Sequence, residues 1–229
     1  MLFYVYLYIL PIHWTDFTEV RVKYPTLKCR TLMAAHESTM VALGIPAPDF
    51  SLPDTNPNTD KDLYTLSDFS ESEALLVAFI CNHCPYVVHL RQGLVNFSRD
   101  YELQRLAVVA ISANDVSTHP HDAPAKMADA SLEFGFRFPY LFDETQAVAK
   151  AYQAACTPDF FLYDLDRTLF YRGQFDDSRP NNGQEVTGND LRRAVDALLL
   201  GDPPPTEQIA SIGCNIKWKA GKEPDYFSA

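Results

Sequence analysis

The chain has 229 residues, of which 47% are apolar and 21% charged, and this balance excludes a mainly disordered or collagen-like protein. Its 19 basic and 30 acidic residues give a net charge of -11, and such a surface repels phosphate backbones and anionic lipid. No apolar run approaches the roughly 20 residues that a membrane helix needs. We therefore expect neither nucleic acid nor a membrane among its partners.

The first 32 residues differ in character from the rest of the chain. Met1–Leu10 are apolar and aromatic like a signal-peptide core, but no basic residue precedes them and no small-x-small cleavage site follows closely. Met33 opens MAAHESTM, a second candidate start, and a globular pattern begins only near Gly44. We interpret residues 1–32 as upstream sequence that is not part of the natural protein, with a short strand as the alternative.

Beyond residue 44 the sequence alternates patterns typical of strands and helices. The runs at 74–80 (ALLVAFI) and 106–112 (LAVVAIS) are apolar throughout, which is typical of strands covered on both faces. Residues 82–102 carry apolar side chains at three- and four-residue steps, as in an amphipathic helix. Strand, helix and strand at this spacing predict parallel pairing with a right-handed crossover.

The other predicted elements are shorter. In chain order we expect a strand at 63–66, a helical turn capped by Ser67 or Asp68, a helix at 125–134, a strand at 140–142, a helix at 145–152, a hairpin of strands at 159–163 and 168–172, and a helix at 190–200 capped by Thr187 or Asn189 and stopped by Gly201. This order predicts an α/β fold, a central mixed β-sheet flanked by helices. We place the domain at residues 41–201, with an N-terminal extension at 1–40, disordered or a non-native leader, and a C-terminal tail at 202–229.

Cysteine usage indicates the compartment. The five cysteines are too few and too scattered for a disulfide-scaffolded secreted domain; they are Cys29, Cys81, Cys84, Cys156 and Cys214. With no convincing export signal, we expect a reducing, cytoplasmic location. In such a compartment a close cysteine pair is more often catalytic or metal-binding than structural.

The sharpest motif is Cys81-Asn82-His83-Cys84, where a predicted strand ends and the long helix begins. Unpaired N–H groups and a partial positive charge at a helix N-terminus stabilise a thiolate, so we expect the pKa of Cys81 to fall below that of a free thiol. Two intervening residues place the sulfurs about one helical turn apart, within reach of disulfide exchange. Pro85 fits because the amides of a first turn have no helical partner.

Two other interpretations of this cysteine pair are weaker. A zinc site would need two more ligands, and the candidates with local pairing, His119 and His121, have an unusual ligand spacing. Two buried bystander thiols are also conceivable, but the location at a helix start disfavours them. We therefore predict a redox pair and no metal.

A second motif carries a family resemblance. Residues 44–52 (GIPAPDFSL) resemble the G-x-x-A-P-D-F-x-L opening of the thioredoxin-like redoxins of the alkyl hydroperoxide reductase C/thiol-specific antioxidant (AhpC/TSA) branch. The C-x-x-C unit and Thr157-Pro158 ahead of a strand extend the resemblance to about residues 44–200. It implies a thioredoxin-like fold and a cis peptide bond at Pro158 that faces the cysteine pair, where exposed backbone groups can pair with an incoming peptide or thiol. An ordinary trans proline at a strand edge is the alternative.

The resemblance implies a thiol–disulfide oxidoreductase. In this interpretation Cys81 attacks a substrate disulfide and Cys84 resolves the mixed disulfide, while a cationic His83 favours the thiolate. A solvated residue at the helix start is the alternative for His83. We expect no bound cofactor, and as partners protein or small-molecule disulfides and a reducing thiol system.

Two other functions stay open. Cys84-Pro85 resembles the Cys-Pro of peroxiredoxins, so a thiol-dependent peroxidase with Cys84 peroxidatic is possible in principle, but their P-x-x-x-T-x-x-C motif would need Pro at Val77 and Thr at Cys81. A redox-regulated binding module without turnover is the non-enzymatic alternative. The strand at 74–80 also carries no buried acid to shuttle a proton, and Ile80 replaces the tryptophan of thioredoxin.

The remaining two cysteines are candidates for additional redox thiols. If Pro158 is the cis-proline, Cys156 lies close to the loop that faces Cys81. Cys214 lies in an Ile- and Trp-containing stretch of the tail, which we expect to dock on the domain and to cover part of the site. We favour two separate buried thiols. A second couple, Cys156–Cys214, is the alternative hypothesis.

Overall fold

The computed structural model of the chain describes residues 35–103 and 105–227. The predicted leader at 1–32 and Cys29 lie outside the described residues. A mixed sheet of five strands forms the centre, in the order β6-β5-β4-β8-β9. Its strands are β4 (Ala74–Phe79), β5 (Leu106–Ser112), β6 (Tyr140–Phe142), β8 (Asp159–Tyr163) and β9 (Leu169–Gly173). β4, β5 and β6 are parallel to one another, β8 runs antiparallel to β4, and β9 runs antiparallel to β8. The predicted mixed sheet with antiparallel last strands is thus confirmed.

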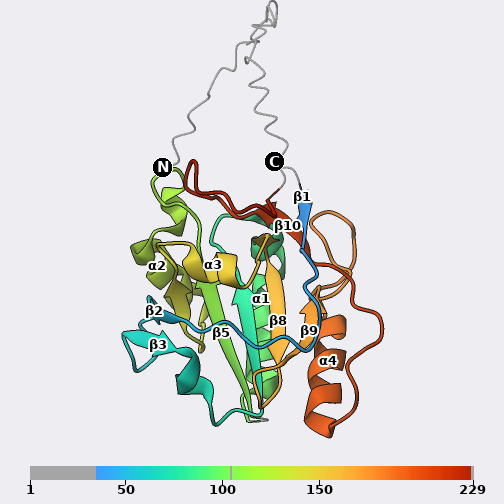
Figure 1. Cartoon of the computed structure of the whole chain (residues 1–229). Helices are drawn as coiled ribbons and strands as arrows, with labels where there is room; N and C mark the ends of the chain where they lie inside the picture. Colours follow the sequence, from blue (N-terminus) through green and yellow to red (C-terminus); the bar gives the residue numbers. More distant parts are fainter. Residues whose placement is uncertain (1–34, 104, 228–229) are drawn as a thin grey trace, which may run out of the picture. The chain divides into compact units, whose positions relative to one another are not determined.

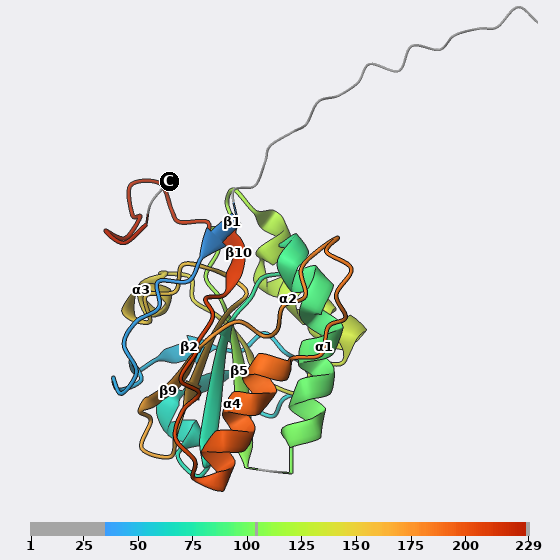
Figure 2. The same ribbon diagram turned by 90° about the vertical axis from the view of Figure 1, so that its right-hand side faces the viewer.

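Four helices cover this sheet (Figures 1 and 2). They are α1 (Pro85–Tyr101), α2 (Pro124–Phe134), α3 (Ala147–Ala151) and α4 (Asn189–Leu200), with 3-10 turns at Leu66–Phe69 and Pro120–Asp122. Each of the four α-helices lies within the range that the sequence predicts or extends it by one residue. Figure 2 separates α1 and α4 from α3 on opposite sides of the sheet.

The alternation of side chains along β4 explains the two layers. Leu76 and Ala78 point into the core beneath α1 and α4, whereas Leu75 and Val77 point into the core that holds α3. All six residues of β4 are buried, because side chains of successive strand residues face opposite sides and both sides are covered.

Two small sheets lie beside the central one. β2 (Ser51–Pro53) pairs with β3 (Leu63–Thr65), and β10 (Ile212–Asn215) lies between β1 (Ala35–Glu37) and β7 (Cys156–Thr157). The structure thus puts a paired strand inside the range 1–40 that the sequence assigned to an extension, and another inside the predicted tail. Strands of two to four residues show no periodicity, and their partners here lie far away in the sequence, so the pattern could not reveal them.

The C-terminal segment packs on the domain beyond β10. Ile216 and Trp218 are buried in the core that holds α3. The amide of Lys217 donates to Asn114 Oδ1 at 2.8 Å, and the amide of Lys219 donates to Gln146 Oε1 at 2.8 Å. These contacts join the tail to the ends of β5 and α3.

The N-terminus of α4 differs from the prediction. The capping residue is Gly188, in a left-handed conformation (φ +69°), and neither Thr187 nor Asn189 caps the helix. The buried carboxylate of Asp176 instead accepts from the amides of Thr187 and Gly188, both at 2.6 Å. These two amides precede the helix, so Asp176 holds the loop that leads into α4, while the amide of Leu191 in its first turn donates to the Phe175 carbonyl oxygen at 3.2 Å. In the part of the chain that the structure describes, no helix is long and apolar enough to cross a membrane.

Candidate redox site

The cysteine pair lies between the end of β4 and the start of α1. Pro85 is the first helical residue, and Cys84 is the N-cap in an extended conformation (φ -63°, ψ 123°). A residue before proline is pushed out of the helical region, so the helix begins three residues later than its apolar pattern indicates. The thiol at the helix N-terminus is therefore that of Cys84, and Cys81 lies on the connection before it.

Thr157 and Pro158 face the two sulfurs. The Thr157–Pro158 peptide bond is cis, as the family resemblance implies. Cys84 Sγ lies 3.0 Å from the Thr157 carbonyl oxygen, and Cys81 Sγ lies 3.4 Å from the Thr157 hydroxyl. The two thiols lie close enough to shift each other's pKa. The geometry brings together all the residues predicted for this pair.

The local donors favour a thiolate on Cys84. Hydrogen bonds from the thiols of Cys214 and Cys81, and from the amide of Val87 in the first turn of α1, lower the pKa of Cys84 far below its usual value. Burial opposes this shift, and the Thr157 carbonyl favours the protonated thiol, but the donors to the sulfur outweigh both. A helix N-terminus thus does stabilise a thiolate here, on the second cysteine of the motif.

The pKa of Cys81 moves in the opposite direction, so our prediction for it is wrong. The hydrogen bond to Cys84 and burial raise the pKa of Cys81 well above its usual value, and the Asp122 carboxylate adds to the rise. These two directions favour a negative charge on Cys84 over one on Cys81. The physical reason is the extra turn before the helix, which puts Cys81 out of reach of the first free amides.

Asp122 is the functional residue that sequence reasoning missed. Its fully buried carboxylate accepts from the amide of Asn82 at 2.8 Å, from Asn114 Nδ2 at 2.8 Å and from His83 Nδ1 at 2.6 Å. Burial raises the pKa of Asp122, but the hydrogen bonds from His83 and Asn114 outweigh it and the net shift is downward. One signal was available: the loop after β5 leaves the same edge of the sheet as the cysteine loop after β4, because the strands are parallel.

His83 lies in the site but interacts with Asp122 first. Its ring stacks on His119 with the centroids 5.1 Å apart, and its Nε2 is buried without a hydrogen-bond partner among the described residues. Donor atoms of Cys81, His83 and Asp122 lie within 4.8 Å of one another, the kind of group that can hold a metal. The His83 nitrogen and the Asp122 oxygen are only 2.6 Å apart, whereas two ligands on one tetrahedral zinc would lie roughly 3.3 Å apart. The pair is therefore arranged as a hydrogen bond.

Cys156 and Cys214 do not face one another. In the antiparallel ladder Cys214 is opposite Thr157, and Asn215 is opposite Cys156. Directly opposed residues share a face and neighbours alternate, so the two cysteines point to opposite faces and our hypothesis of a Cys156–Cys214 couple is wrong. Cys156 Sγ lies 3.4 Å from the Pro158 carbonyl oxygen, and burial raises the pKa of its thiol.

The two sulfurs of the motif are shielded from solvent. Cys81 is 2% exposed and Cys84 is 0% exposed. A groove of about 570 Å³ runs beside them, lined by Asn82 and His83 and by basic and acidic side chains that include Arg91 and Lys126. A bulky substrate can reach the sulfurs only if a covering segment moves.

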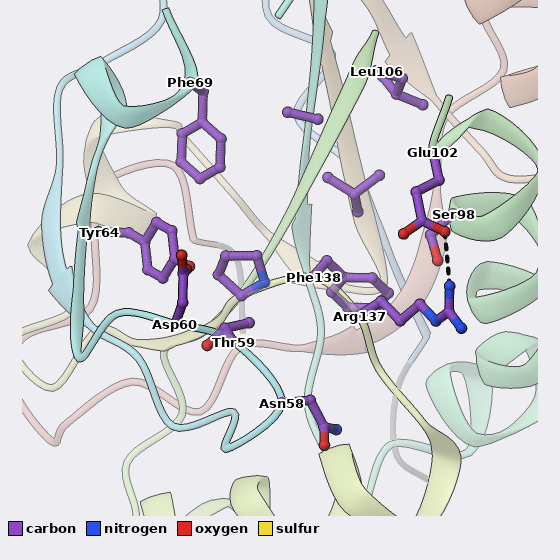
Figure 3. A pocket seen from close by; sticks show the side chains of 13 residues that line it. Asn58, Thr59, Asp60, Tyr64, Phe69, Ser98, Glu102, Leu106, Arg137 and Phe138 are labelled. Carbon is purple, nitrogen blue, oxygen red and sulfur yellow. Dashed lines mark hydrogen bonds and ion pairs between the residues drawn. The ribbon is translucent and has the colours of Figure 1, made fainter. Parts of the chain in front are cut away.

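Figure 3 shows a second cavity, of about 500 Å³, at the opposite end of the sheet. It is lined by Tyr64 and Phe69 and by the first residues of β5, and the Arg137–Glu102 ion pair closes one side of it. Leu106 in the wall of this cavity pairs with Ala74, the first residue of β4, whereas Cys81 comes two residues after the last residue of that strand. This cavity therefore has no part in the chemistry of the cysteine pair.

Comparisons with known proteins agree with this geometry. The AhpC/TSA family model matches residues 43–172. No curated protein matches the chain. Among solved structures, a hypothetical protein from Sinorhizobium meliloti 1021 is 54% identical over 81% of this chain and 99% of its own, with a TM-score of 0.78. An uncharacterized conserved protein from Geobacillus kaustophilus is 50% identical over 82% and 98%, with a TM-score of 0.79.

A more distant structure shows the fold alone. The thioredoxin domain of a thiol-disulfide oxidoreductase from Bacteroides vulgatus is 16% identical over 67% of this chain and 97% of its own, with a TM-score of 0.50. The mixed sheet, the helix that starts beside the cysteine pair and the facing cis-proline make the fold thioredoxin-like. The match over more than half of the residues leads to one conclusion: this chain belongs to the AhpC/TSA family.

Proposed function

We propose that the protein is a thiol–disulfide oxidoreductase that cycles Cys81 and Cys84 between dithiol and disulfide. The observation that supports this most strongly is that both sulfurs contact Thr157, the residue before the cis-proline. In each cycle the pair loses two electrons and two protons to a substrate disulfide, which becomes two thiols. A reducing thiol system, such as that of the cytoplasm, then restores the dithiol.

The order of attack follows from the charge. A thiolate is the nucleophile in disulfide exchange, and the donors around Cys84 favour that residue. The Cys84 thiolate attacks a substrate sulfur and expels the other as a thiolate. Cys81 then gives up its proton and attacks Cys84 Sγ, which releases the second substrate thiol and leaves the Cys81–Cys84 disulfide. This order reverses the roles that the sequence alone suggested.

Turnover assays test the proposal. Insulin reduction by the wild type with dithiothreitol should proceed, and Cys84→Ser should abolish it. Cys81→Ser should lose turnover through the Cys81–Cys84 disulfide, and Cys81→Ser/Cys214→Ser, which also lacks the neighbouring Cys214 thiol, should accumulate a mixed disulfide with substrate through Cys84. Cys156→Ser is the matched control, because its side chain faces away from the pair. Wild-type activity in Cys84→Ser would contradict the proposal.

A thiol peroxidase is the second candidate, and burial of the sulfurs favours it. Hydrogen peroxide is small enough to enter where a protein disulfide cannot. The Cys84 thiolate would attack one peroxide oxygen, forming a sulfenic acid and water, and Cys81 would condense with it to the disulfide and a second water. Against it, Val77 and Cys81 occupy the positions of the peroxidase Pro and Thr. The buried Arg172 is ion-paired with Asp159, so its charge is not directed at the Cys84 thiolate.

Peroxide consumption decides between the candidates. If the wild type consumes hydrogen peroxide with dithiothreitol but does not reduce insulin, the peroxidase is correct. If it reduces insulin only, the oxidoreductase is correct. If it does neither, a binding module whose pair only switches a surface remains.

A further inference from the structure

Cys214 of β10 lies against the redox pair. It is opposite Thr157 in the ladder, and the Thr157 carbonyl oxygen is 3.0 Å from Cys84 Sγ. Cys81, Cys84 and Cys214 share one buried cluster, and the thiols of Cys84 and Cys214 shift each other's pKa. β10 therefore brings a third thiol to the cysteine pair between β4 and α1.

The residue before Cys214 fixes this approach. A Cβ added to Gly213 would lie 2.0 Å from the Thr157 carbonyl oxygen, so a strand with any other residue there could not pack so closely. β10 is held on its other edge by β1, with His36 opposite Gly213. The close approach of β10 to the Thr157 carbonyl, which contacts Cys84 Sγ, is thus built into the backbone.

We propose that Cys214 is a second disulfide partner of Cys84, so that the site has two oxidised forms, Cys81–Cys84 and Cys84–Cys214. This inference rests on the proposed function, because the first disulfide is its product. Its basis is the position of Cys214 opposite Thr157, whose carbonyl oxygen lies 3.0 Å from Cys84 Sγ, in the buried cluster that also holds Cys81.

The exchange between the two forms needs no further oxidant. Cys214 loses its proton and its thiolate attacks Cys84 Sγ of the Cys81–Cys84 disulfide. The Cys84–Cys214 bond forms, the Cys81–Cys84 bond breaks, and Cys81 leaves as a thiolate that takes up a proton. Both forms are two electrons more oxidised than the trithiol, and the number of protons is unchanged.

The second form would have a distinct consequence for the tail. A Cys84–Cys214 bond joins β10 covalently to the N-terminus of α1, while Cys81 becomes a free thiol. The tail also contacts the Asp122 network, since the amide of Lys217 donates to Asn114, which donates to Asp122. Oxidation at Cys214 would therefore hold β10 and the residues up to Lys217 against the cysteine pair.

Peptide mapping separates the two forms. Trypsin cuts after Lys61 and Arg91, so Cys81 and Cys84 share the peptide 62–91, whereas Cys214 lies in 194–217 and Cys156 in 151–167. The full-length protein is oxidised with diamide, free thiols are blocked with N-ethylmaleimide before unfolding, and the digest is read without reduction. The first form gives a closed 62–91 peptide and the second gives a cross-link between 62–91 and 194–217.

The variants give opposite results. Cys81→Ser should place most molecules in the cross-linked form, and Cys81→Ala repeats the test if the serine variant does not fold. Cys214→Ser should abolish the cross-link and leave the closed 62–91 peptide, and Cys156→Ser should match the wild type. The cross-link in wild type and its enrichment in Cys81→Ser would support the proposal.

Two results keep this proposal distinct from the proposed function. If the wild type turns over and forms the closed 62–91 peptide, but neither it nor the Cys81 variants form the cross-link, Cys214 is not a redox partner although the function stands. A cross-link from 194–217 to 151–167 in place of 62–91 would also overturn it. Without any closed peptide or turnover, the proposed function itself fails.

Discussion

Cys84 and Cys81 are three residues apart but receive different donors, and this difference decides which one is charged. Only Cys84 accepts from the first turn of α1, through the amide of Val87. An unperturbed cysteine thiol has a pKa of about 8.5. We predict that a thiolate absorbing at 240 nm persists well below that pH in Cys81→Ser. In Cys84→Ser no thiolate should persist below about pH 7, because the sulfur that accepts from the amide of Val87 is gone and burial raises the pKa values of Cys81, Cys156 and Cys214. The reverse pattern would return the charge to Cys81.

Asp122 shows how a residue outside the motif supports it. Its pKa is lowered in the folded state, so the ionised carboxylate stabilises the fold above its unfolded pKa, and this contribution is lost as the pH falls through the folded value. Asp122→Asn should lower the free energy of unfolding at pH 7 by about 1–3 kcal/mol, the range for losing a hydrogen-bonded charge. The difference from wild type should shrink below pH 4. Urea unfolding at both pH values measures this, and a difference unchanged by pH would contradict it.

The motif could be found from the sequence at this scale, but its surroundings could not. Cys81, Cys84 and Thr157-Pro158 are visible as patterns, and the structure brings them together. The charge was assigned to the wrong sulfur because one proline moves the helix start. Asp122 gave no pattern, since its role depends on a loop that folds back from the neighbouring strand.

Among the elements, β10 is the strand of the tail that lies against the site, and we expect it to limit access to the sulfurs. Gly213→Ala would bring a methyl group against the Thr157 carbonyl, and overpacking of this kind costs about 1–3 kcal/mol. We predict that β10 undocks more often and that Cys84 and Cys214 react with Ellman's reagent roughly 5- to 150-fold faster, the factor that this energy corresponds to. Glu207→Ala is the control in the same tail, because its side chain is exposed.

An unchanged reaction rate in Gly213→Ala would mean that the tail does not limit access to the sulfurs.

The elements that the sequence predicted are those with long apolar patterns, such as β4 and α1. β1, β7 and β10 were missed because two to four residues carry no period and their pairing is decided by distant partners.

For the molecule as a whole, the buried ion pair of Arg172 and Asp159 joins distant parts of the chain. The two side chains are fully buried 3.1 Å apart, and Arg172 also donates to the hydroxyls of Ser38 and Thr39 next to β1. Arg172→Met leaves a carboxylate unpaired, and breaking a buried pair in this way costs about 3–5 kcal/mol. We predict that loss in urea unfolding at pH 7, and a smaller one in Arg172→Met/Asp159→Asn.

The pH dependence of this variant has a defined sign. Burial raises the pKa of Asp159, and Arg172 opposes the rise. Without Arg172 the pKa of Asp159 in the folded protein rises further. The stability of Arg172→Met is therefore retained below the pKa of Asp159 in the unfolded chain and lost as the pH rises through its pKa in the folded protein. The deficit of Arg172→Met should therefore be largest at pH 7 and small near pH 4. A deficit that grows toward acid would contradict the account.

The fold of the whole molecule was largely predictable, because the order of strands and helices and the resemblance at residues 44–52 agree with the structure and the family. The predicted boundaries at 40 and 202 differ from where the structure has β1 and β10 pair. These strands belong to one sheet with β7, which only the folded chain brings together.

The account depends on two neighbouring sulfurs that exchange electrons reversibly. The direct measurement equilibrates the wild-type protein with glutathione mixtures of increasing oxidation and follows the closed 62–91 peptide by mass spectrometry. We predict that this peptide closes in a reversible two-electron transition and that its closed form is absent in both Cys81→Ser and Cys84→Ser. A 62–91 peptide that stays open at every glutathione ratio would contradict the account.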